Sequence, residues 1–369
     1  MPISEFRVFI NNEAADSAML DRFTEIHVDQ AIGMAWEAEL KLDLVADEQG
    51  NWSDSSEELA EPMERVRVEV KIGTGSFVPL IDGPVVNQKF DFSSSPGRSA
   101  LTLMVQDDSV LLNQDETVEV FEDLTPDEIA ATLMEAAGLE VEADPVPDAG
   151  SDLERFVVQR GSAMRLLRRL ARQHGMFVYV RPGSQPGKSI GVFAKPDLSP
   201  SDLPEMVLMG ADRNVNYVTV EFDALRPMAA SAGSVRISDV TSLNSEIDAS
   251  DDTPLGDSPV HSLLTPAKVL LAHTREEQSD LDAAAQAAVN LSSWAYTARG
   301  EVAADVYAGV LEPLRLVRVV GIGARLSGDY LISRVRHSLN FESYKQAFTL
   351  LRNARLEGGN GGGLLEGVF

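Results

Sequence analysis

The stretch WEAELKLDL, residues 36–44, carries the pattern that decides the fold. Apolar side chains alternate with charged ones along it, Ala38, Leu40, Leu42 and Leu44 against Glu37, Glu39, Lys41 and Asp43. Because successive side chains of a β-strand point to opposite faces, this alternation predicts a strand with one face in a core and the other in water. RVRVEVKI, residues 65–72, repeats the pattern, with its charged side chains, Arg67 and Glu69 among them, expected in water.

Strands extend outward from these two stretches over the N-terminal third of the chain. They are expected at residues 6–10, 23–30, 77–81 and 99–107, with turns at 73–76 and 93–97. The acidic, serine-rich segment 47–62 is expected to be a surface loop. Residues 1–110 are therefore predicted to form a first β domain.

Two helices are predicted after residue 110. Thr125 is expected to cap the first one, because a proline follows at the first helical position and Glu128 completes a capping box. The second helix is expected to begin after Ser162 and to end at Gly175, and the strand MFVYV follows it. Residues 111–205 are therefore predicted to form a mixed α/β middle domain.

Strands return after about residue 206. They are expected at 216–225, 234–240, 301–309, 314–323, 329–340 and 343–353, interrupted by an acidic loop at 241–265 and by a helix at 276–298. The last residues, 356–369, are glycine-rich and are expected to be a flexible tail. No internal repeat is visible in the letters. Residues 206–355 are predicted to form a second β domain, so the fold class is mainly β with an α/β insertion.

Composition limits the classes of function. The chain of 369 residues has 58 acidic and 31 basic side chains, a formal net charge of −27, and this argues against a nucleic-acid binder, which needs a positive surface. The absence of cysteine excludes disulfides, thiolate metal sites and cysteine nucleophiles. No apolar run of about 18 residues or N-terminal signal pattern is present, so we expect synthesis in the cytoplasm and no insertion into a membrane.

A basic stripe lies on the helix predicted at 162–175. Arg165, Arg168 and Arg172 follow one another at spacings of three and four, with Arg169 beside them, opposite the leucines. We interpret the stripe as a solvated face that pairs with the many carboxylates of this protein or of a neighbouring subunit. A phosphate-binding stripe is the alternative.

Motifs that would carry catalytic or cofactor chemistry are incomplete. GSQPGKS (183–189) has Pro182 where a phosphate loop needs its first glycine, and GIGARLSG (321–328) has its third glycine too late for a dinucleotide fingerprint, so both are predicted to be turns. The five histidines are scattered and G-x-S-x-G is absent. We therefore expect no catalytic, cofactor-binding or metal site, although a pair of carboxylates brought together in space stays open.

Two segments resemble the phage late control D and VgrG-type tail-hub family. The first has the family order of a glutamine, a glycine, a serine, an apolar helix and a closing glycine, at Gln159, Gly161, Ser162, Leu166, Leu167, Leu170 and Gly175. It departs from the family by reading Gln-Arg-Gly-Ser. The second has the family ending of paired glycines and a patterned strand, at Gly321, Gly323, Gly328, Tyr330, Ile332, Val335 and His337.

The resemblance implies a tail hub built from two tube-like β-barrel domains that flank the α/β domain. Three such chains would form a pseudo-hexameric ring that meets a hexameric inner tube on one side and a separate three-fold spike protein on the other. It also implies baseplate wedge components as neighbours, a tape-measure protein or cargo in the lumen, and incorporation into the baseplate of a phage tail or injection particle. His337 is expected to be a hydrogen-bonded structural residue rather than a catalytic one.

Two further hypotheses accompany the hub. If enough of the net charge faces the lumen, the wall would repel DNA or acidic cargo. The alternative function is a cell-wall hydrolase carried at the tail tip. The sequence leaves open whether the particle is a phage tail, an extracellular injection device or a type VI system.

Overall fold

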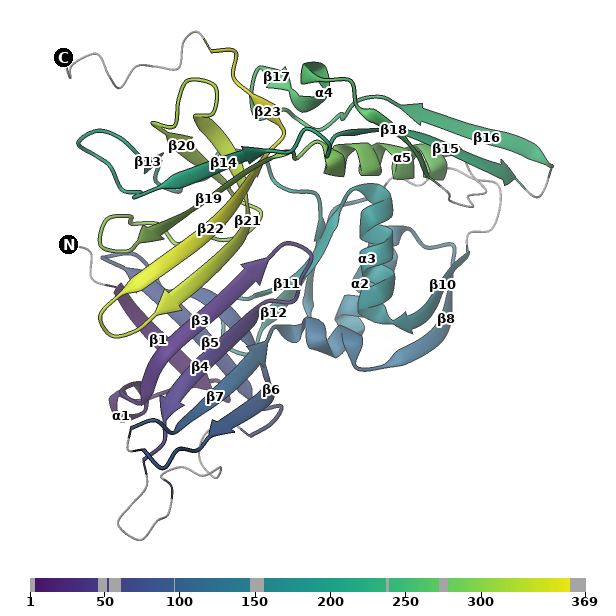
Figure 1. Ribbon diagram of the computed structural model, residues 1–369. Coiled ribbons are helices and arrows are strands. Elements are labelled where there is room, and N and C mark those ends of the chain that lie inside the picture. Colours follow the sequence, from purple (N-terminus) through teal and green to yellow (C-terminus); the bar gives the residue numbers. More distant parts are fainter. Residues whose placement is uncertain are drawn as a thin grey trace.

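A computed structural model describes residues 4–45, 52, 61–95, 97–146, 156–236, 239–271 and 278–358 (Figure 1). The described strands include the two that opened the sequence analysis, at residues 37–43 and 65–72. The predicted loop at 47–62 and tail at 356–369 fall mostly outside the described residues.

The first β region is a bent sheet with strand order β2-β1-β5-β6-β7-β4-β3. Its elements are β1 (Ser4–Ile10), β2 (Glu13–Ala14), α1 (Ser17–Leu20), β3 (Phe23–Ala31), β4 (Glu37–Asp43), β5 (Arg65–Ile72), β6 (Val78–Asp91), β7 (Ala100–Gln106) and the 3-10 helix η1 (Asp108–Asn113). β6 is longer than predicted because it serves both walls of the bend. Its first half pairs with β5 and its second half with β7.

Gly83 lies beside the point at which β6 changes partner, between Pro84 and Val85. A Cβ atom there would lie 1.8 Å from the carbonyl oxygen of Gln106, so a side chain would prevent this approach of the two strands. The apolar side chains of both walls meet inside the bend, with Val68, Leu40 and Leu103 buried among them. The alternation predicted from residues 36–44 therefore fills this core.

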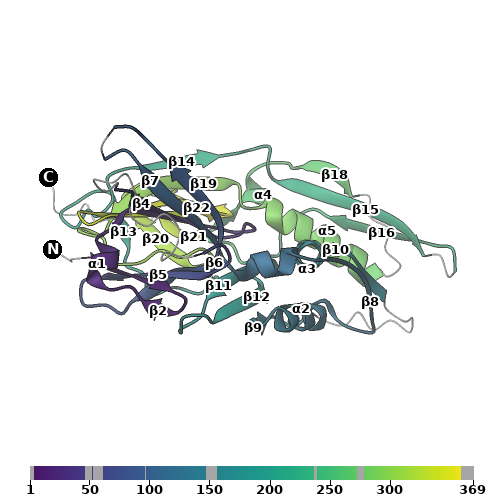
Figure 2. The same cartoon turned by 90° about the horizontal axis from the view of Figure 1, so that it is seen from below.

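The middle region contains two helices and two small sheets. Its elements are β8 (Glu116–Glu122), α2 (Pro126–Ala136), β9 (Glu140–Ala143), β10 (Phe156–Ser162), α3 (Ala163–His174), β11 (Phe177–Pro182) and β12 (Ser189–Ala194). The predicted capping box at Thr125 and Glu128 is present, and Ser162 and Gly175 cap α3 as expected. Figure 2 shows these helices beside the large sheet rather than within it.

The second β region adds strands to the same sheet and carries a separate ribbon. Its elements are β13 (Met206–Val207), β14 (Val218–Phe222), β15 (Met228–Arg236), β16 (Thr241–Ile247), β17 (Ser258–Pro259), α4 (Val260–Leu263), β18 (Ala267–Leu271), α5 (Gln278–Ser292), β19 (Tyr296–Ala303), β20 (Leu316–Val320), β21 (Gly328–Leu339), β22 (Tyr344–Arg352) and β23 (Ala354–Arg355). β16, β15 and β18 form the ribbon, which α5 covers (Figure 1).

Four expectations for the two β regions are wrong. The strand predicted at 301–309 ends at Ala303, because β19 covers Tyr296–Ala303 and a turn follows it. Segment 241–265 is not a loop throughout, because β16, β17 and α4 lie within it. The helix predicted at 276–298 ends at Ser292, where the Ser292 and Ser293 hydroxyls bond to the carbonyls of Val289 and Asn290, and β19 begins at Tyr296. Arg67 and Glu69 are buried rather than wet, since a carboxylate and a turn of the middle region cover them.

The two β regions are joined edge to edge. β3 pairs antiparallel with β21, and the sheet then runs β14-β19-β22-β21-β3-β4-β7-β6 without a break (Figure 1). No sheet closes on itself within the described residues, so the two closed β-barrels expected of one chain are absent there. The eight strands from β14 to β6 instead form one continuous, curved sheet, which we call the wall.

The two halves of this wall have the same pairing register. Ala38 in β4 lies opposite Val105 in β7, and Ala298 in β19 lies opposite Leu350 in β22. The ladder shifts by one residue at the equivalent point of each half, after Val85 in β6 and after Ile332 in β21. The chain therefore contains a structural repeat that its letters do not display.

Candidate assembly interface

One face of the continuous sheet is charged in both halves. Its acidic side chains are Glu25, Asp29, Glu37, Glu39, Asp43, Asp91, Glu221 and Glu301, and its basic side chains are Lys41, Lys89, Arg299, Arg334, Arg336 and Lys345. All are exposed or half-buried, while the side chains between them point into the cores. The sheet is therefore wet on one side and packed on the other.

Charge is unevenly divided over this face. Strands β3, β4, β7 and β6 carry six of its carboxylates and two lysines, whereas β14, β19, β22 and β21 carry two carboxylates and four cations. Carboxylates thus exceed cations by only two on the described sheet face. Most of the net −27 therefore lies elsewhere than on this described face.

The seam between β21 and β3 combines an ion pair and a buried hydrogen-bond chain. On the charged face, Nε of Arg334 donates to Oδ1 of Asp29 over 2.8 Å. On the core face, His337 is fully buried and bonds to the Tyr344 hydroxyl at 2.8 Å and to Oε1 of Gln30 at 3.1 Å. Gln30 in turn donates to the carbonyl of Leu80.

Burial lowers the pKa of His337 to about 3. The ring is therefore neutral. Since Nε2 of Gln30 is used as a donor to Leu80, its oxygen faces the imidazole and accepts the Nε2 proton, while Nδ1 accepts the Tyr344 hydroxyl proton. This arrangement joins four strands, β22, β21, β3 and β6, across the seam.

The part of the sheet that runs from β14 to β6 has two open edges. No described strand pairs with the outer edge of β14, nor with the outer edge of β6 beyond Pro84. Exposed apolar side chains lie at both places, because Phe92 is 57% and Phe222 38% exposed. Unpaired strand edges with exposed apolar side chains are sites where another strand can add.

A buried ion cluster joins the first β region to the middle region. Arg67 donates to Glu69 at 2.8 Å and to Asp82 at 3.0 Å, and Arg65 donates to the other oxygen of Asp82. The turn GSQPGKS is the β11–β12 hairpin, as predicted, and Gly187 N–H donates to Asp82 at 3.0 Å. The segment that resembles a phosphate-binding loop therefore forms a contact between the middle region and the first β region.

The first signature segment lies wholly in the middle region. Gln159 is buried and donates to the Thr117 hydroxyl and to the carbonyl of Gly161, which has a φ of +108°. Ser162 caps α3 by accepting from Arg165 N–H. Leu166, Leu167 and Leu170 are buried in the core of this region.

Gly175, the last residue of this segment, closes α3 in the left-handed region with a φ of +65°. A Cβ atom there would lie 3.5 Å from Cβ of Ala287 in α5, so the glycine also marks where the two helices approach.

The second signature segment lies in the second β region. Gly321 and Gly323 form the turn before β21, with φ of +81° and +96°. A Cβ atom at Gly328 would lie 2.7 Å from the guanidinium of Arg352, which also lies over the ring of Tyr330. Tyr330, Ile332 and Val335 belong to the core of this region. The structure therefore does not bring the two signature segments together into one site.

The basic stripe of α3 bonds to backbone carbonyls rather than to described carboxylates of its own chain, and its pairing with a neighbouring subunit stays a prediction. Arg169 donates to the carbonyl of Val158 at 2.8 Å, and Arg172 to that of Arg168 at 3.3 Å. None of the four arginines forms an ion pair with a carboxylate in the part of the chain that the structure describes. Burial and the neighbouring Arg165 lower the pKa of Arg169.

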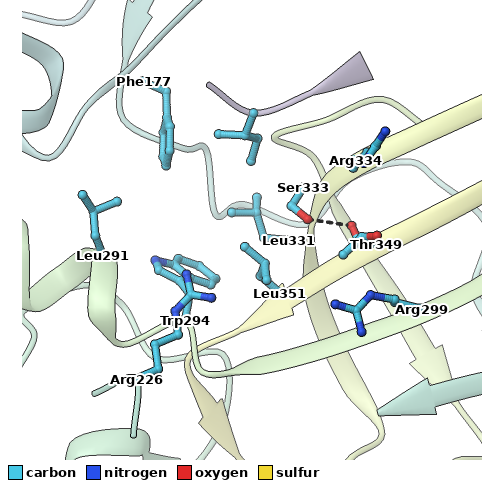
Figure 3. Close-up of a pocket in the computed structure, with 11 residues that line it drawn as sticks. Phe177, Arg226, Leu291, Trp294, Arg299, Leu331, Ser333, Arg334, Thr349 and Leu351 are labelled. Carbon is cyan, nitrogen blue, oxygen red and sulfur yellow. Dashed lines mark hydrogen bonds between the residues drawn. The ribbon is translucent and has the colours of Figure 1, made fainter. Parts of the chain in front are cut away.

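A pocket of about 410 Å³ opens at the end of the charged sheet face (Figure 3). Phe177 of β11 and Trp294 and Leu291 near the end of α5 form one wall. Opposite them, Ser333 donates to the carbonyl of Thr349 at 2.9 Å. Its described lining contains arginines but no carboxylate, so it offers no acid–base pair.

Metal and membrane features are likewise missing from the described ranges. No group of three or more histidine, aspartate or glutamate side chains is placed to hold a metal ion among them. No helix among the described residues has the length and apolarity to span a bilayer.

The sequence patterns described above do not predict the open edges or the repeat. The signal for the repeat is weak but present, since WEAELKL (36–42) and YTARGEV (296–302) share an aromatic residue, an alanine, two charged residues and a final aliphatic one at the same spacing. Only the pairing register shows that these stretches are equivalent.

Solved structures share this fold over almost the whole chain. The prophage MuSo2 43 kDa tail protein from Shewanella oneidensis matches with a TM-score of 0.64 at 14% identity, covering 95% of this chain and 99% of that one. The tail protein from Neisseria meningitidis MC58 matches with a TM-score of 0.64 at 13% identity, covering 95% and 97%. The expected mainly β fold is therefore shared with tail proteins, whereas the closed barrels expected with it are not seen among the described residues.

A component of the E. coli type VI secretion system, described as structurally similar to phage T4 tail proteins, also has this fold. It matches with a TM-score of 0.55 at 10% identity, covering 95% of this chain and 76% of that one. In sequence, the family described as the Alg8 N-terminal domain matches residues 3–340. None of the curated proteins matches the chain.

Proposed function

We propose that this chain, which belongs to the Alg8 N-terminal domain family, is the hub of a contractile or phage-like tail. In this role it is a structural protein of the late control D and VgrG type. It joins a six-fold inner tube to a three-fold spike, which is a separate protein, within the baseplate of a tail or injection particle.

One observation supports this proposal above the others. Each chain contains two four-stranded units that share one pairing register and are joined in one continuous sheet. Three chains then present six equivalent units, which matches a hexameric tube, while the three-fold symmetry suits the spike. The two open edges allow the wall to close on neighbouring copies, so the closed barrel belongs to the trimer rather than to one chain.

The charged sheet face would line the channel, where a tape-measure protein or cargo passes. Its mixed charges suit a wet wall that binds no particular partner tightly. The packed face and the middle region would point outward, toward baseplate wedge components. The role requires no catalytic group, cofactor, membrane insertion or specific nucleic acid.

Light scattering and negative-stain imaging of the isolated chain test the proposal. We expect a mass of about 120 kDa, three times the 40.0 kDa of one chain, and rings with a central opening in end-on views. A monomer or dimer at concentrations that support tube binding would contradict it.

The alternative function, a cell-wall hydrolase at the tail tip, is tested separately. A gel containing peptidoglycan would show clearing around a hydrolase, whereas the hub leaves none. Clearing that depends on a carboxylate of this chain would overturn the structural role.

A further inference from the structure

We propose that the open half of β6 in one copy pairs, antiparallel, with β14 of the next copy, and that Lys89 lies opposite Glu221 in this joint. The inference rests on the proposed trimer. It adds to the trimer the two edges that meet and the register in which they meet.

The register follows from the seam inside one chain. There β21 pairs with β3, and Arg336 lies opposite Asp29. Lys89 is the counterpart of Arg336, because each lies four residues after the last residue before its ladder shift, Val85 or Ile332. The β6 edge of a second copy is thus equivalent to the edge that β21 offers to β3.

The partner edge is assigned in the same way. Asp29 lies opposite Glu37 in β4, and Glu221 lies opposite Thr297 in β19. Because β4 and β19 share one register against β7 and β22, Glu221 is the counterpart of Asp29. β14 is therefore the copy of β3 that still lacks its second neighbour among the described strands.

Charge at the two edges is complementary in this register. The cation–carboxylate pair of Lys89 and Glu221 repeats the sign of Arg336 and Asp29. Both side chains are well exposed, and each also has a partner within its own chain, Asp91 at 2.7 Å and Arg299 at 3.3 Å. Exposed pairs of this kind stabilise an interface only weakly, so they set register more than affinity.

Apolar burial supplies the larger driving force. The same register places Phe90 opposite Val220 and Phe92 opposite Val218. The seam counterparts of these four, His337, Val28, Leu339 and Ile26, are all buried, whereas Phe92 is 57% exposed in the single chain. Burial of such an apolar side chain stabilises an interface more than an exposed ion pair does. The exposed edges thus have the composition of a seam that waits for its second strand.

Disulfide trapping tests the register without background, because the chain has no cysteine. The in-register variant is Lys89→Cys with Glu221→Cys. Its off-register control is Lys89→Cys with Thr219→Cys, which lies two residues away on the same face. Arg336→Cys with Asp29→Cys is the calibrating control, since it should form a bond of the same geometry within one chain.

After mild oxidation, we expect the in-register variant to run as a covalent trimer on a denaturing gel without reductant. A closed ring leaves no free thiol among its six, whereas an open chain of three leaves two. We expect at least a tenfold lower trimer yield from the off-register control, and a monomer without free thiols from the calibrating control.

The possible failures are distinct. If light scattering shows a trimer but only the off-register pair crosslinks, or neither pair does while the calibrating control does, the joint proposed here is wrong and the hub stands. A variant that is monomeric in light scattering, like the unmodified chain, overturns both. A native circular dichroism spectrum of each variant before oxidation excludes misfolding as the cause.

Discussion

The two β halves share one strand register but fill it with different chemistry. Asp107 and Arg352 occupy equivalent positions at the ends of β7 and β22, and both are buried. Asp107 accepts from backbone N–H groups, that of Trp36 at 2.6 Å, while Arg352 donates to backbone carbonyls, that of Leu255 at 2.7 Å. In both halves a buried charged side chain at this position bonds to backbone groups of nearby loops. The side chain is an acceptor where the loops present N–H groups and a donor where they present carbonyls.

Core volume is also redistributed between the halves. Leu40 lies opposite Leu103 in the first half, and Gly300 lies opposite Phe348 in the second. A Cβ atom at Gly300 would lie 2.5 Å from the Phe348 ring and 2.5 Å from the carbonyl of Tyr217. The first half thus fills this position with two leucine side chains, and the second half fills it with one phenylalanine ring opposite a glycine. Both cores stay close-packed.

The largest expected effect on stability concerns the two buried arginines. Arg67 in the first half bonds to carboxylates, whereas Arg352 in the second half bonds to backbone carbonyls. Arg67→Met leaves the carboxylates of Glu69 and Asp82 buried with one cation fewer, and we expect a loss of about 3–5 kcal/mol in the free energy of unfolding. Arg352→Met strands carbonyls but no described carboxylate, so about 1–3 kcal/mol is expected. Denaturant titration of the two variants measures the difference, and equal losses would contradict this account.

Volume exchange is tested by Gly300→Ala. The new methyl group meets the Phe348 ring and a backbone carbonyl, and we expect a loss of ~1–3 kcal/mol in the free energy of unfolding. Gly233→Ala in β15 is the matched control, because its Cβ would meet only Asn244 Oδ1, at 3.7 Å, and Leu243 O, at 4.0 Å. A Gly300→Ala chain as stable as the control would show that the core relaxes freely there.

The pH dependence separates the halves, since His337 occupies the position that Phe90 has in the first one. Burial holds the pKa of His337 at about 3, below its usual 6.5, so the unfolded chain binds the extra proton. Its contribution to stability is complete above pH 6.5 and falls by about 1.4 kcal/mol per pH unit as the pH drops toward 3.

The variant His337→Gln should lack that part of the pH slope. Unfolding free energies of both proteins between pH 7 and 4 measure it, and carboxylates shared by both proteins cancel in the comparison. Parallel slopes would contradict the assigned burial of a neutral ring.

The smallest effect is expected outside both halves, in the middle region. Ser162→Ala removes the side chain that caps α3, and a loss of about 1 kcal/mol is expected, whereas Ser162→Gly should cost only a few tenths. Thermal unfolding of the two variants measures the difference. If Ser162→Ala also abolished the trimer, α3 would take part in assembly, contrary to the proposal that the β regions alone form the joints between copies.

Much of the local structure could be predicted from the sequence. Alternation placed β4 and β5, and the caps at Thr125, Ser162 and Gly175 placed α2 and α3, because these signals depend on neighbours within a few residues. The burial of Arg67 could not be predicted, since its partners Asp82 and the turn at 183–188 come from other strands. The end of α5 was misplaced because alanine-rich residues continue the helical pattern past Ser292.

By itself, the sequence determined where most elements of the first β region and the middle region lie, the wet and packed faces of β4, and the capped helix ends, since alternation and caps act over short spans. Only the tertiary structure decided that the two β regions form one sheet and repeat one register. The single sheet results from pairing between strands about 300 residues apart, such as that of Arg336 with Asp29. Backbone hydrogen bonds form this pairing, and they do not depend on residue type, so the sequence does not reveal it. Side chains that fill one register with leucines or with glycine and phenylalanine look unrelated until the strands are laid side by side.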